Sequence, residues 1–252
     1  MIGSFLQRFS FLTDVPLVGS WIQAVWRRSL YYRYLSIWWR NARVHDGSAP
    51  INPFKLYWIS PSRVKYDAIS PGAKAFRFNT DTGRVRDGDW DRKRRDITDH
   101  SLWDGLHERY EQGIPWPETE YYQRKLQPIH EGKKSVGCYS EQELREKYEQ
   151  IDRVYESMKA DGYRSEREIV GARRAEALHE ITVHVGRDGT LLRGGAGNHR
   201  IRLAHFLELD EIAVRIVVRH EQWQAKRDQI AAGEATPEDF GLDPEHPDLR
   251  GL

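Results

Sequence analysis

The clearest pattern of apolar positions along the chain predicts one long α-helix over residues 141–161. Apolar side chains recur there at steps of three and four, which is the spacing of one face of a helix. They are Leu144, Tyr148, Ile151, Val154, Tyr155 and Met158. Ser140 and Glu143 have the spacing of a capping box at the start, and Gly162 is a typical terminator. The helix therefore has a defined beginning, an apolar face and a defined end.

A second pattern, alternation with a period of two and runs of β-branched residues, predicts strands on either side of this helix. The predicted elements are a strand over 55–59, a strand over 180–186, a turn at 187–189, a strand over 190–193, a helix over 199–207 and a strand over 212–218. Between residues 101 and 138 short helical pieces are expected, broken by Pro115, Pro117 and Pro128. Strands and helices that follow one another in this way predict an α/β (α+β) fold with a small mixed sheet.

The first 45 residues differ from the rest of the chain in composition. They hold six arginines and a single acid, Asp14, interleaved with ten aromatic residues, and residues 20–43 are predicted to be helical. Aromatic rings and guanidinium groups suit an anionic membrane surface, and the same mixture can stack on nucleic-acid bases. The third option, which we favour, is a helical pair that packs on the main domain or on a protein partner such as a second copy. The sequence leaves all three open.

Charge over the whole chain is nearly balanced, with 39 Lys and Arg against 38 Asp and Glu, so the protein has no general bias toward a polyanion. Residues 228–252, however, carry seven acids and one arginine. The single cysteine, Cys138, excludes a disulfide framework and a cysteine-rich metal site. The longest weakly charged window, 9–26, contains Asp14 and Pro16, so no membrane span is expected. We expect a cytoplasmic protein, with a peripheral position at the inner membrane face as an option through its basic first segment.

The richest candidate chemistry lies in the sequence Gly-Gly-Ala-Gly-Asn-His-Arg that leads into the last predicted helix. Gly195 and Gly197 let the backbone approach a ligand closely, and Asn198 is a good N-cap for the helix. Free amides at a helix start, with His199 and Arg200 beside them, suit a phosphate group. Neither Gly-Lys-Ser/Thr nor Gly-x-Gly-x-x-Gly is present, so this is not a Walker A loop or a dinucleotide fingerprint. The alternative is a tight strand-to-helix turn with a solvated Arg200.

The order of strand, Asp-Gly turn, strand, glycine-rich His-Arg segment and helix over residues 180–223 resembles the ParB/sulfiredoxin superfamily domain. Leu56–Val64 and the helix at 141–162 are similar to the strand and helix that precede this core in family members, and residues 67–140 separate the two blocks. The resemblance implies a ParB-like nucleotide-binding fold with a nucleotide-phosphate site at Gly197–Arg200. ParB-type CTPases, sulfiredoxins and ParB-like free serine kinases each place nucleotide phosphates there.

Two departures from the family pattern narrow the function that the resemblance implies. Sulfiredoxins have a catalytic cysteine directly before His-Arg, where this chain has Asn198, so a sulfinic-acid reductase is not expected. Chromosome-partition members have Gly-Glu-Arg-Arg in place of Gly197–Arg200 and continue into a helix-turn-helix domain. Here an acidic segment follows Trp223 instead, so a chromosome-partition role is not expected either.

These patterns divide the chain into three expected parts. Residues 1–45 form a basic aromatic helical region, and residues 54–223 form the ParB/sulfiredoxin-like domain. An insertion over 67–140 interrupts this domain and supplies a pocket for an acceptor molecule. Residues 224–252 form an acidic C-terminal tail.

Two further groups of charged residues are candidates for the same site. Asp89 and Asp91 lie with Asp87 in one short loop, close enough in sequence to hold Mg²⁺ or to supply a base. The alternative, which we favour, is a polar turn whose acids pair with neighbouring arginines. Arg219 and His220 end the last predicted strand and either reach the edge of the phosphate site or form an exposed strand end.

Together these expectations describe a protein that binds a nucleoside di- or triphosphate (ATP, ADP or CTP), with or without Mg²⁺. It would use this ligand for phosphoryl transfer to a small-molecule acceptor or for hydrolysis. His199 and Arg200 would neutralise developing charge, and Asp89 or Asp91 would act as metal ligand or base. One alternative is a non-catalytic module that recognises a phosphate or a protein partner and is held at a membrane by residues 1–45. The other is a DNA-binding or nuclease protein.

Overall fold

The computed structural model describes residues 32, 35, 55–76, 81–169 and 180–252. The helix predicted over 20–43 lies outside the described residues except for Tyr32 and Leu35, which are helical. The membrane, nucleic-acid and packing options for the basic N-terminal region lie outside them as well. Among the described helices, none combines the length and apolar character that crossing a bilayer requires.

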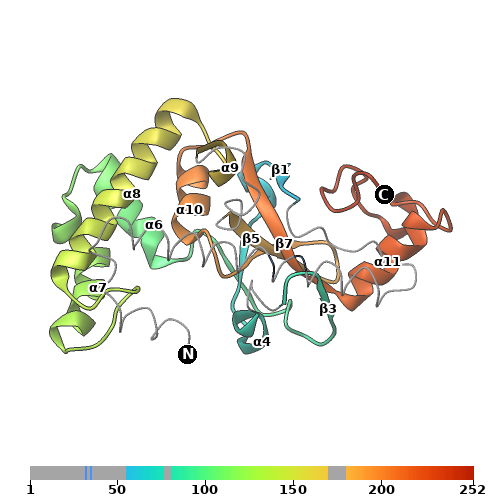
Figure 1. Cartoon of the computed structure of the whole chain (residues 1–252), viewed down its shortest axis with the longest axis horizontal. Coiled ribbons are helices and arrows are strands. Elements are labelled where there is room, and N and C mark those ends of the chain that lie inside the picture. The colour runs from blue at the N-terminus through green and yellow to red at the C-terminus, as the bar shows by residue number, and fades with distance from the viewer. Residues whose placement is uncertain (1–31, 33–34, 36–54, 77–80, 170–179) are drawn as a thin grey trace.

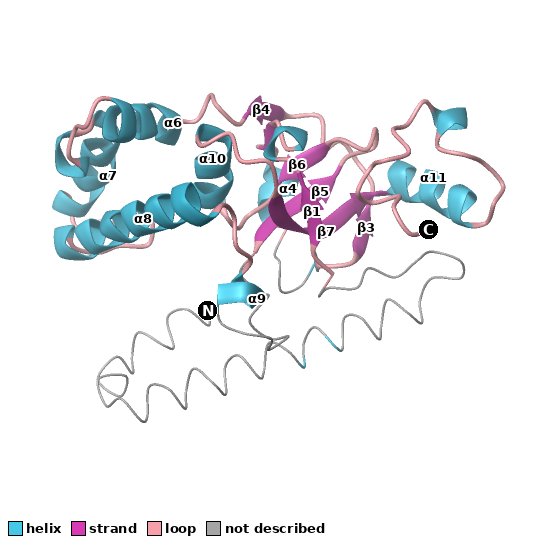
Figure 2. Ribbon diagram, turned by 90° about the horizontal axis from the view of Figure 1, so that it is seen from above, coloured by secondary structure: helices cyan, strands magenta, loops and turns pink. Residues whose placement is uncertain are grey.

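A seven-stranded mixed sheet forms the centre of the described structure (Figures 1 and 2). The strands are β1 (Tyr57–Ile59), β2 (Tyr66–Ala68), β3 (Arg84–Arg86), β4 (Arg94–Asp96), β5 (Ile181–Val185), β6 (Leu191–Arg193) and β7 (Ile212–His220). Their order is β1-β7-β5-β6-β2-β4, and β3 also pairs with β7. Parallel pairs (β5 with β7, β2 with β6, β3 with β7) alternate with antiparallel ones. The α/β class and the mixed sheet predicted from the sequence are confirmed.

Helices surround the sheet on two sides. They are α4 (Pro71–Ala75), α6 (Ser101–Leu106), α7 (Glu120–His130), α8 (Glu141–Asp161), α9 (Glu166–Ile169), α10 (Asn198–Phe206) and α11 (Glu221–Ala231). A π-helical turn over His107–Glu111 and 3-10 turns at Pro61–Arg63, Trp116–Glu118 and Glu238–Phe240 complete the described helical elements. Figure 2 shows α6, α7 and α8 gathered at one end of the molecule, with α10 between them and the sheet, and α11 at the opposite end.

Helix α8 begins and ends as the sequence predicts. Ser140 Oγ accepts a hydrogen bond from the Glu143 N–H at 3.2 Å, and the Glu143 carboxylate accepts one from the Tyr139 N–H at 2.6 Å. Gly162 ends the helix with φ of +73°, a conformation that L side chains rarely adopt. Of the predicted apolar face, Val154 is half-buried and the other positions are buried: Leu144, Tyr148, Ile151, Tyr155 and Met158.

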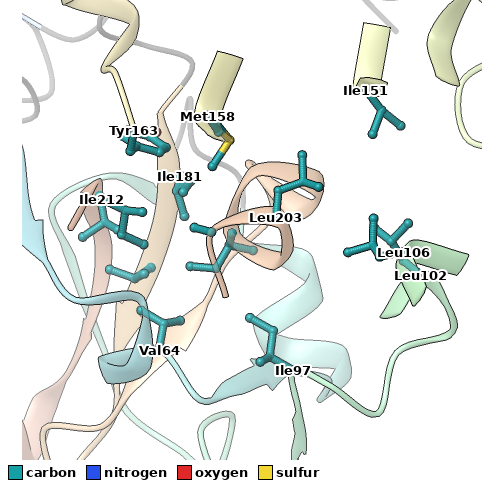
Figure 3. Close-up of a cluster of buried hydrophobic side chains, with 14 of the residues drawn as sticks. Val64, Ile97, Leu102, Leu106, Ile151, Met158, Tyr163, Ile181, Leu203 and Ile212 are labelled. Carbon is teal, nitrogen blue, oxygen red and sulfur yellow. The ribbon is translucent and has the colours of Figure 1, made fainter. Parts of the chain in front are cut away.

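The core is continuous from the sheet to the helical end of the molecule (Figure 3). Ile181 of β5 and Ile212 of β7 lie near Met158 of α8, and Leu203 of α10 stands between them and Leu106 of α6. These side chains are at most a few per cent exposed. Burial of each is worth about 1.5–3 kcal/mol, so α10 is fixed between the sheet and α8 by packing.

The segment over 67–140, expected to be an insertion, contributes to the central sheet. Its first boundary falls inside β2, and β3 and β4 also belong to the sheet. The strands β3 and β4 have only three residues each and read Arg-Val-Arg and Arg-Arg-Asp, so neither has the apolar alternation that identifies a strand. Pro128 was expected to break a helix but lies within the last turns of α7, where it removes one backbone donor.

The acidic C-terminal segment is folded onto the end of β7. Its first part forms α11, and the Asp248 carboxylate is buried against the Arg219 guanidinium with contacts of 2.7 and 2.5 Å. The Trp223 indole N–H donates to the same carboxylate at 2.8 Å, and Arg227 donates to the Asp248 carbonyl at 2.9 Å. Sequence composition gave no sign of this long-range ion pair.

We predict that Asp248→Asn lowers the free energy of unfolding by about 3–5 kcal/mol, because it leaves the buried Arg219 guanidinium without its counter-charge. Urea unfolding followed by circular dichroism measures the change. Glu234→Gln, in the same segment, makes the same acid-to-amide change at an exposed position and should have an effect of less than about 0.5 kcal/mol. Equal effects of the two substitutions would contradict a structural role for Asp248.

Candidate anion site at the glycine loop

The residues 194–197, here named the glycine loop, connect β6 to α10 and are fastened to the first residues of β5. The Gly194 N–H donates to the Thr182 carbonyl at 2.7 Å, and the Ala196 N–H donates to Thr182 Oγ1 at 2.9 Å. Gly195 is exposed, and a Cβ atom there would meet nothing within 4 Å. The loop therefore has a fixed path with one open position.

Gly197 is a position at which the backbone conformation and a close neighbour both require glycine. Its φ is +80°, and a Cβ atom would lie 2.6 Å from Cγ1 of Ile181. Gly197, not Asn198 as predicted, is the N-cap residue of α10. Asn198 is the first helical residue, and its side-chain oxygen accepts a hydrogen bond from Arg202 at 2.5 Å. The prediction of the cap was wrong by one residue: the asparagine side chain bonds Arg202, one turn further along the same helix, and does not cap the helix start.

Arg200 is held by a buried carboxylate and is not a solvated side chain. Its guanidinium lies 3.4 Å from the Glu180 carboxylate and 3.3 Å from the Tyr163 hydroxyl. Glu180 is fully buried and also accepts hydrogen bonds from the Tyr163 hydroxyl at 2.7 Å and the Glu166 N–H at 2.5 Å. This network fixes the direction of the guanidinium, which lines the cavity described below.

His199 stands beside Arg200 in a setting of basic groups. Its Nε2 atom is buried and has no hydrogen-bond partner among the described residues. Burial, and then the neighbouring charge of Lys147 and Arg202, lower the pKa of the imidazole to about 4. His100 and Arg193 act in the same direction. At neutral pH the imidazole is therefore uncharged, and it offers a hydrogen bond rather than the positive charge expected from the sequence.

A cavity of about 580 Å³ opens between α8 and the start of α10. Its basic lining residues are Lys147, Arg153, Arg164, His199 and Arg200, and its apolar ones include Ile151, Val154, Met158 and Ile169. Glu166 is the carboxylate residue in its described lining. The cavity thus combines an apolar wall with an excess of positive charge, a combination that suits an anion with an apolar body.

Asp89 and Asp91 lie away from this cavity. The Asp91 carboxylate is buried against Arg187, whose backbone N–H, Nε and Nη2 donate to it at 2.8, 3.0 and 2.8 Å. Asp89 contacts Arg187 and Arg92, each at 2.8 Å. Arg187 begins the β5–β6 turn, five residues and about 16 Å along the hairpin from Thr182, to which the glycine loop is fastened. The paired polar turn is therefore what the structure shows, and the shared site predicted for these aspartates and the loop is not formed.

The other predicted site residues also lie elsewhere. Arg219 is bound to Asp248, and the His220 ring accepts the Gln222 N–H at 3.1 Å and contacts the Gly88 carbonyl at 2.9 Å. The glycine loop meets the start of β5. Because β5 and β7 are parallel, these residues at the end of β7 lie at the other end of the strands, away from the loop. Among the described residues, no group of three or more His, Cys, Asp or Glu side chains is arranged to hold a metal ion.

Three residues near Arg200 or in the cavity lining were not predicted from the sequence. Lys147 belongs to the polar side of α8, while Tyr163 and Glu180 flank the segment that joins α8 to β5. Tyr163 and Glu180 contact Arg200, and Lys147 lines the same cavity, only because α10 packs between α8 and the sheet, which no local spacing encodes. The one available signal is the position of Glu180 directly before an apolar strand.

Comparison of the chain with protein-family models, with curated proteins and with solved structures gives no match. The resemblance to the ParB/sulfiredoxin superfamily stays a prediction from the sequence.

The buried histidines predict that the protein loses stability as pH falls from about 6.5 to about 4. Burial lowers the pKa of His184 and of His199 to about 4, below the ordinary value of 6.5. Between these values the unfolded chain binds more protons than the folded one. Each histidine therefore lowers the free energy of unfolding by up to about 1.4 kcal/mol for each pH unit of acidification. Urea unfolding at neutral and mildly acidic pH measures the slope.

His184 provides the control because it is fully buried and lies outside the cavity lining. His184→Gln keeps a polar side chain without a titrating ring and should remove one histidine's share of the slope. A free energy of unfolding that stays constant from neutral pH to about pH 5 would show that these imidazoles are not held neutral by burial.

Proposed function

We propose that this protein binds a phosphate-bearing ligand of the nucleotide class (ATP, ADP or CTP) in the cavity between α8 and the start of α10. The observation that carries the proposal is His199, whose buried Nε2 atom has no partner among the described residues. A buried polar atom of this kind costs free energy unless a ligand or water satisfies it. The basic groups around it make a phosphate oxygen the best-suited partner.

The charge and shape of the cavity support the same ligand class. Arg200 offers a fixed guanidinium fork. Lys147 donates to the Val136 carbonyl at 2.6 Å and brings a second positive charge to the cavity, close enough to His199 to lower its pKa. The first-turn amides of α10 add a favourable dipole for an anion. The apolar wall of α8 gives a surface on which a planar base can lie, and the volume falls within the range of small-molecule sites.

Binding is proposed here without an assigned reaction. Phosphoryl transfer to a small-molecule acceptor, or hydrolysis, needs a base or metal ligand beside the phosphates. The aspartates considered for that role, Asp89 and Asp91, are paired with Arg187 at the far end of the hairpin. Of the functions weighed from the sequence, recognition of a phosphate by a non-catalytic module is the one that uses only groups present at the cavity.

Titration calorimetry with ATP, ADP and CTP tests the proposal. Lys147→Met should weaken binding of the preferred nucleotide at least tenfold, because a charge-assisted hydrogen bond contributes about 1.5–3 kcal/mol. Arg200→Lys keeps the charge, loses the fork and should also weaken binding.

The matched control is Lys159→Met, which removes an exposed lysine of the same helix that does not line the cavity. It should bind as the wild type does. The proposal fails if none of the three nucleotides binds the wild-type protein, or if Lys147→Met and Lys159→Met bind equally well.

Nucleotide binding should also be coupled to the uptake of a proton by His199. A phosphate beside His199 favours the imidazolium form, so its pKa rises from about 4 on binding and a proton is taken up at mildly acidic pH. Nucleotide affinity should therefore increase as pH falls toward 5. Calorimetry at one pH in two buffers of different ionisation enthalpy measures the uptake.

The comparison is with His199→Gln, which keeps a hydrogen-bonding side chain that cannot titrate. The wild type should take up more protons than this variant, whatever the phosphate itself contributes. Equal uptake by the two proteins would place His199 away from the bound phosphate.

A further inference from the structure

A row of three charged residues crosses the sheet beside the glycine loop. Asp67 of β2 lies directly opposite Arg95 of β4 in one register and opposite Arg193 of β6 in the other. Residues in register on neighbouring strands share one face of a sheet, so the three side chains lie side by side. Arg193 is followed at once by the glycine loop.

The row carries more positive than negative charge. Asp67 is buried and accepts hydrogen bonds from Arg193, from Arg95 at 3.2 Å and from Arg202 of α10 at 2.5 Å. Burial raises the pKa of this carboxyl, but the arginines, Arg193 first, outweigh that effect and hold it below its ordinary value. The carboxylate is thus ionised, and one negative charge faces three guanidinium groups.

The remaining donors are distributed unequally among the arginines. Arg202 is fully buried and also binds the Ile97 and Asn198 carbonyls, at 3.1 and 3.3 Å. Arg193 binds the Gly194 carbonyl at 2.7 Å. Arg95 has only the Asp67 contact: its Nε is buried without a partner among the described residues, yet its side chain is 39% exposed.

No second carboxylate in the described part of the chain compensates this excess. Asp96, the next residue of β4, directs its carboxylate to the Thr98 N–H and hydroxyl, at 3.0 and 2.7 Å. Arg94, the preceding residue, lies 3.7 Å from Asp188 and contacts the Tyr66 ring. A cluster built only to join strands would need one guanidinium for one carboxylate, and this one has guanidinium donors in excess.

We propose that Arg95 and Arg193 form a second anion subsite, which takes the carboxylate or phosphate group of a small molecule. Asp67 holds the two guanidinium groups in place while leaving the row positively charged, and the Arg95 and Arg193 side chains remain 39% and 15% exposed to an incoming anion. That this molecule binds together with a nucleotide rests on the proposed function. The anion subsite itself does not.

The test is calorimetry on the full chain saturated with ATP, so that the cavity is filled, with inorganic phosphate in one arm and malonate in the other. We expect the wild type to bind at least one of these anions, and the arm that binds identifies the ligand group. Arg95→Gln should weaken that binding at least tenfold, as expected for the loss of charge-assisted hydrogen bonds.

Arg94→Gln is the matched control, since Arg94 is the neighbouring residue of β4, is also 39% exposed and is bound to Asp188 instead. It should bind the anion as the wild type does. Arg95→Lys, which keeps the charge at Asp67, serves if Arg95→Gln does not fold, and it should bind more weakly than the wild type.

The subsite is overturned if neither anion binds the ATP-saturated wild type, or if the Arg95 and Arg94 variants bind alike. Failure of the proposed function has a different signature. If ATP does not bind but phosphate or malonate binds in a manner that depends on Arg95, the nucleotide proposal falls and the second subsite stands.

Discussion

The close approach of the glycine loop to the first residues of β5 is the constraint on which the described site depends. Gly197 touches Ile181 where any side chain would collide, and Thr182 binds the loop through its backbone and its hydroxyl. Because α10 starts directly after this contact, its first turn has one position relative to the sheet. His199 and Arg200 are thereby fixed against α8, and the cavity follows from that placement.

Electrostatic balance distinguishes the two ends of the β5–β6 hairpin. At the turn, Asp89 and Asp91 are matched by Arg187 and Arg92, so the charges neutralise one another and stabilise the fold. At the glycine loop, by contrast, basic groups outnumber carboxylates on both sides of His199, in the cavity and around Asp67. An excess of buried or half-buried positive charge costs free energy in the empty protein, and a bound anion relieves that cost.

Local patterns in the sequence predicted the elements that local physics determines. The α8 helix follows from its apolar spacing and its capping residues, and the strand-to-helix turn follows from the glycines. The strands β3 and β4 were missed because three residues, of which at most one is apolar, carry no periodic signal, and their pairing partners are distant in sequence. The candidate site was predicted in part, since Arg200 and His199 lie together. Asp91 does not reach the site because its carboxylate is bound to Arg187. Glu180 was not predicted because only tertiary packing brings it to Arg200.

A crystal structure of the protein with its preferred nucleotide tests the central claim most directly. We expect a phosphate oxygen within about 2.7–3.2 Å of the Nε2 atom of His199, with the Arg200 guanidinium and the Lys147 ammonium group on neighbouring oxygens. A nucleotide bound elsewhere, or a cavity filled by the protein's own side chains with His199 Nε2 bonded to one of them, would contradict it.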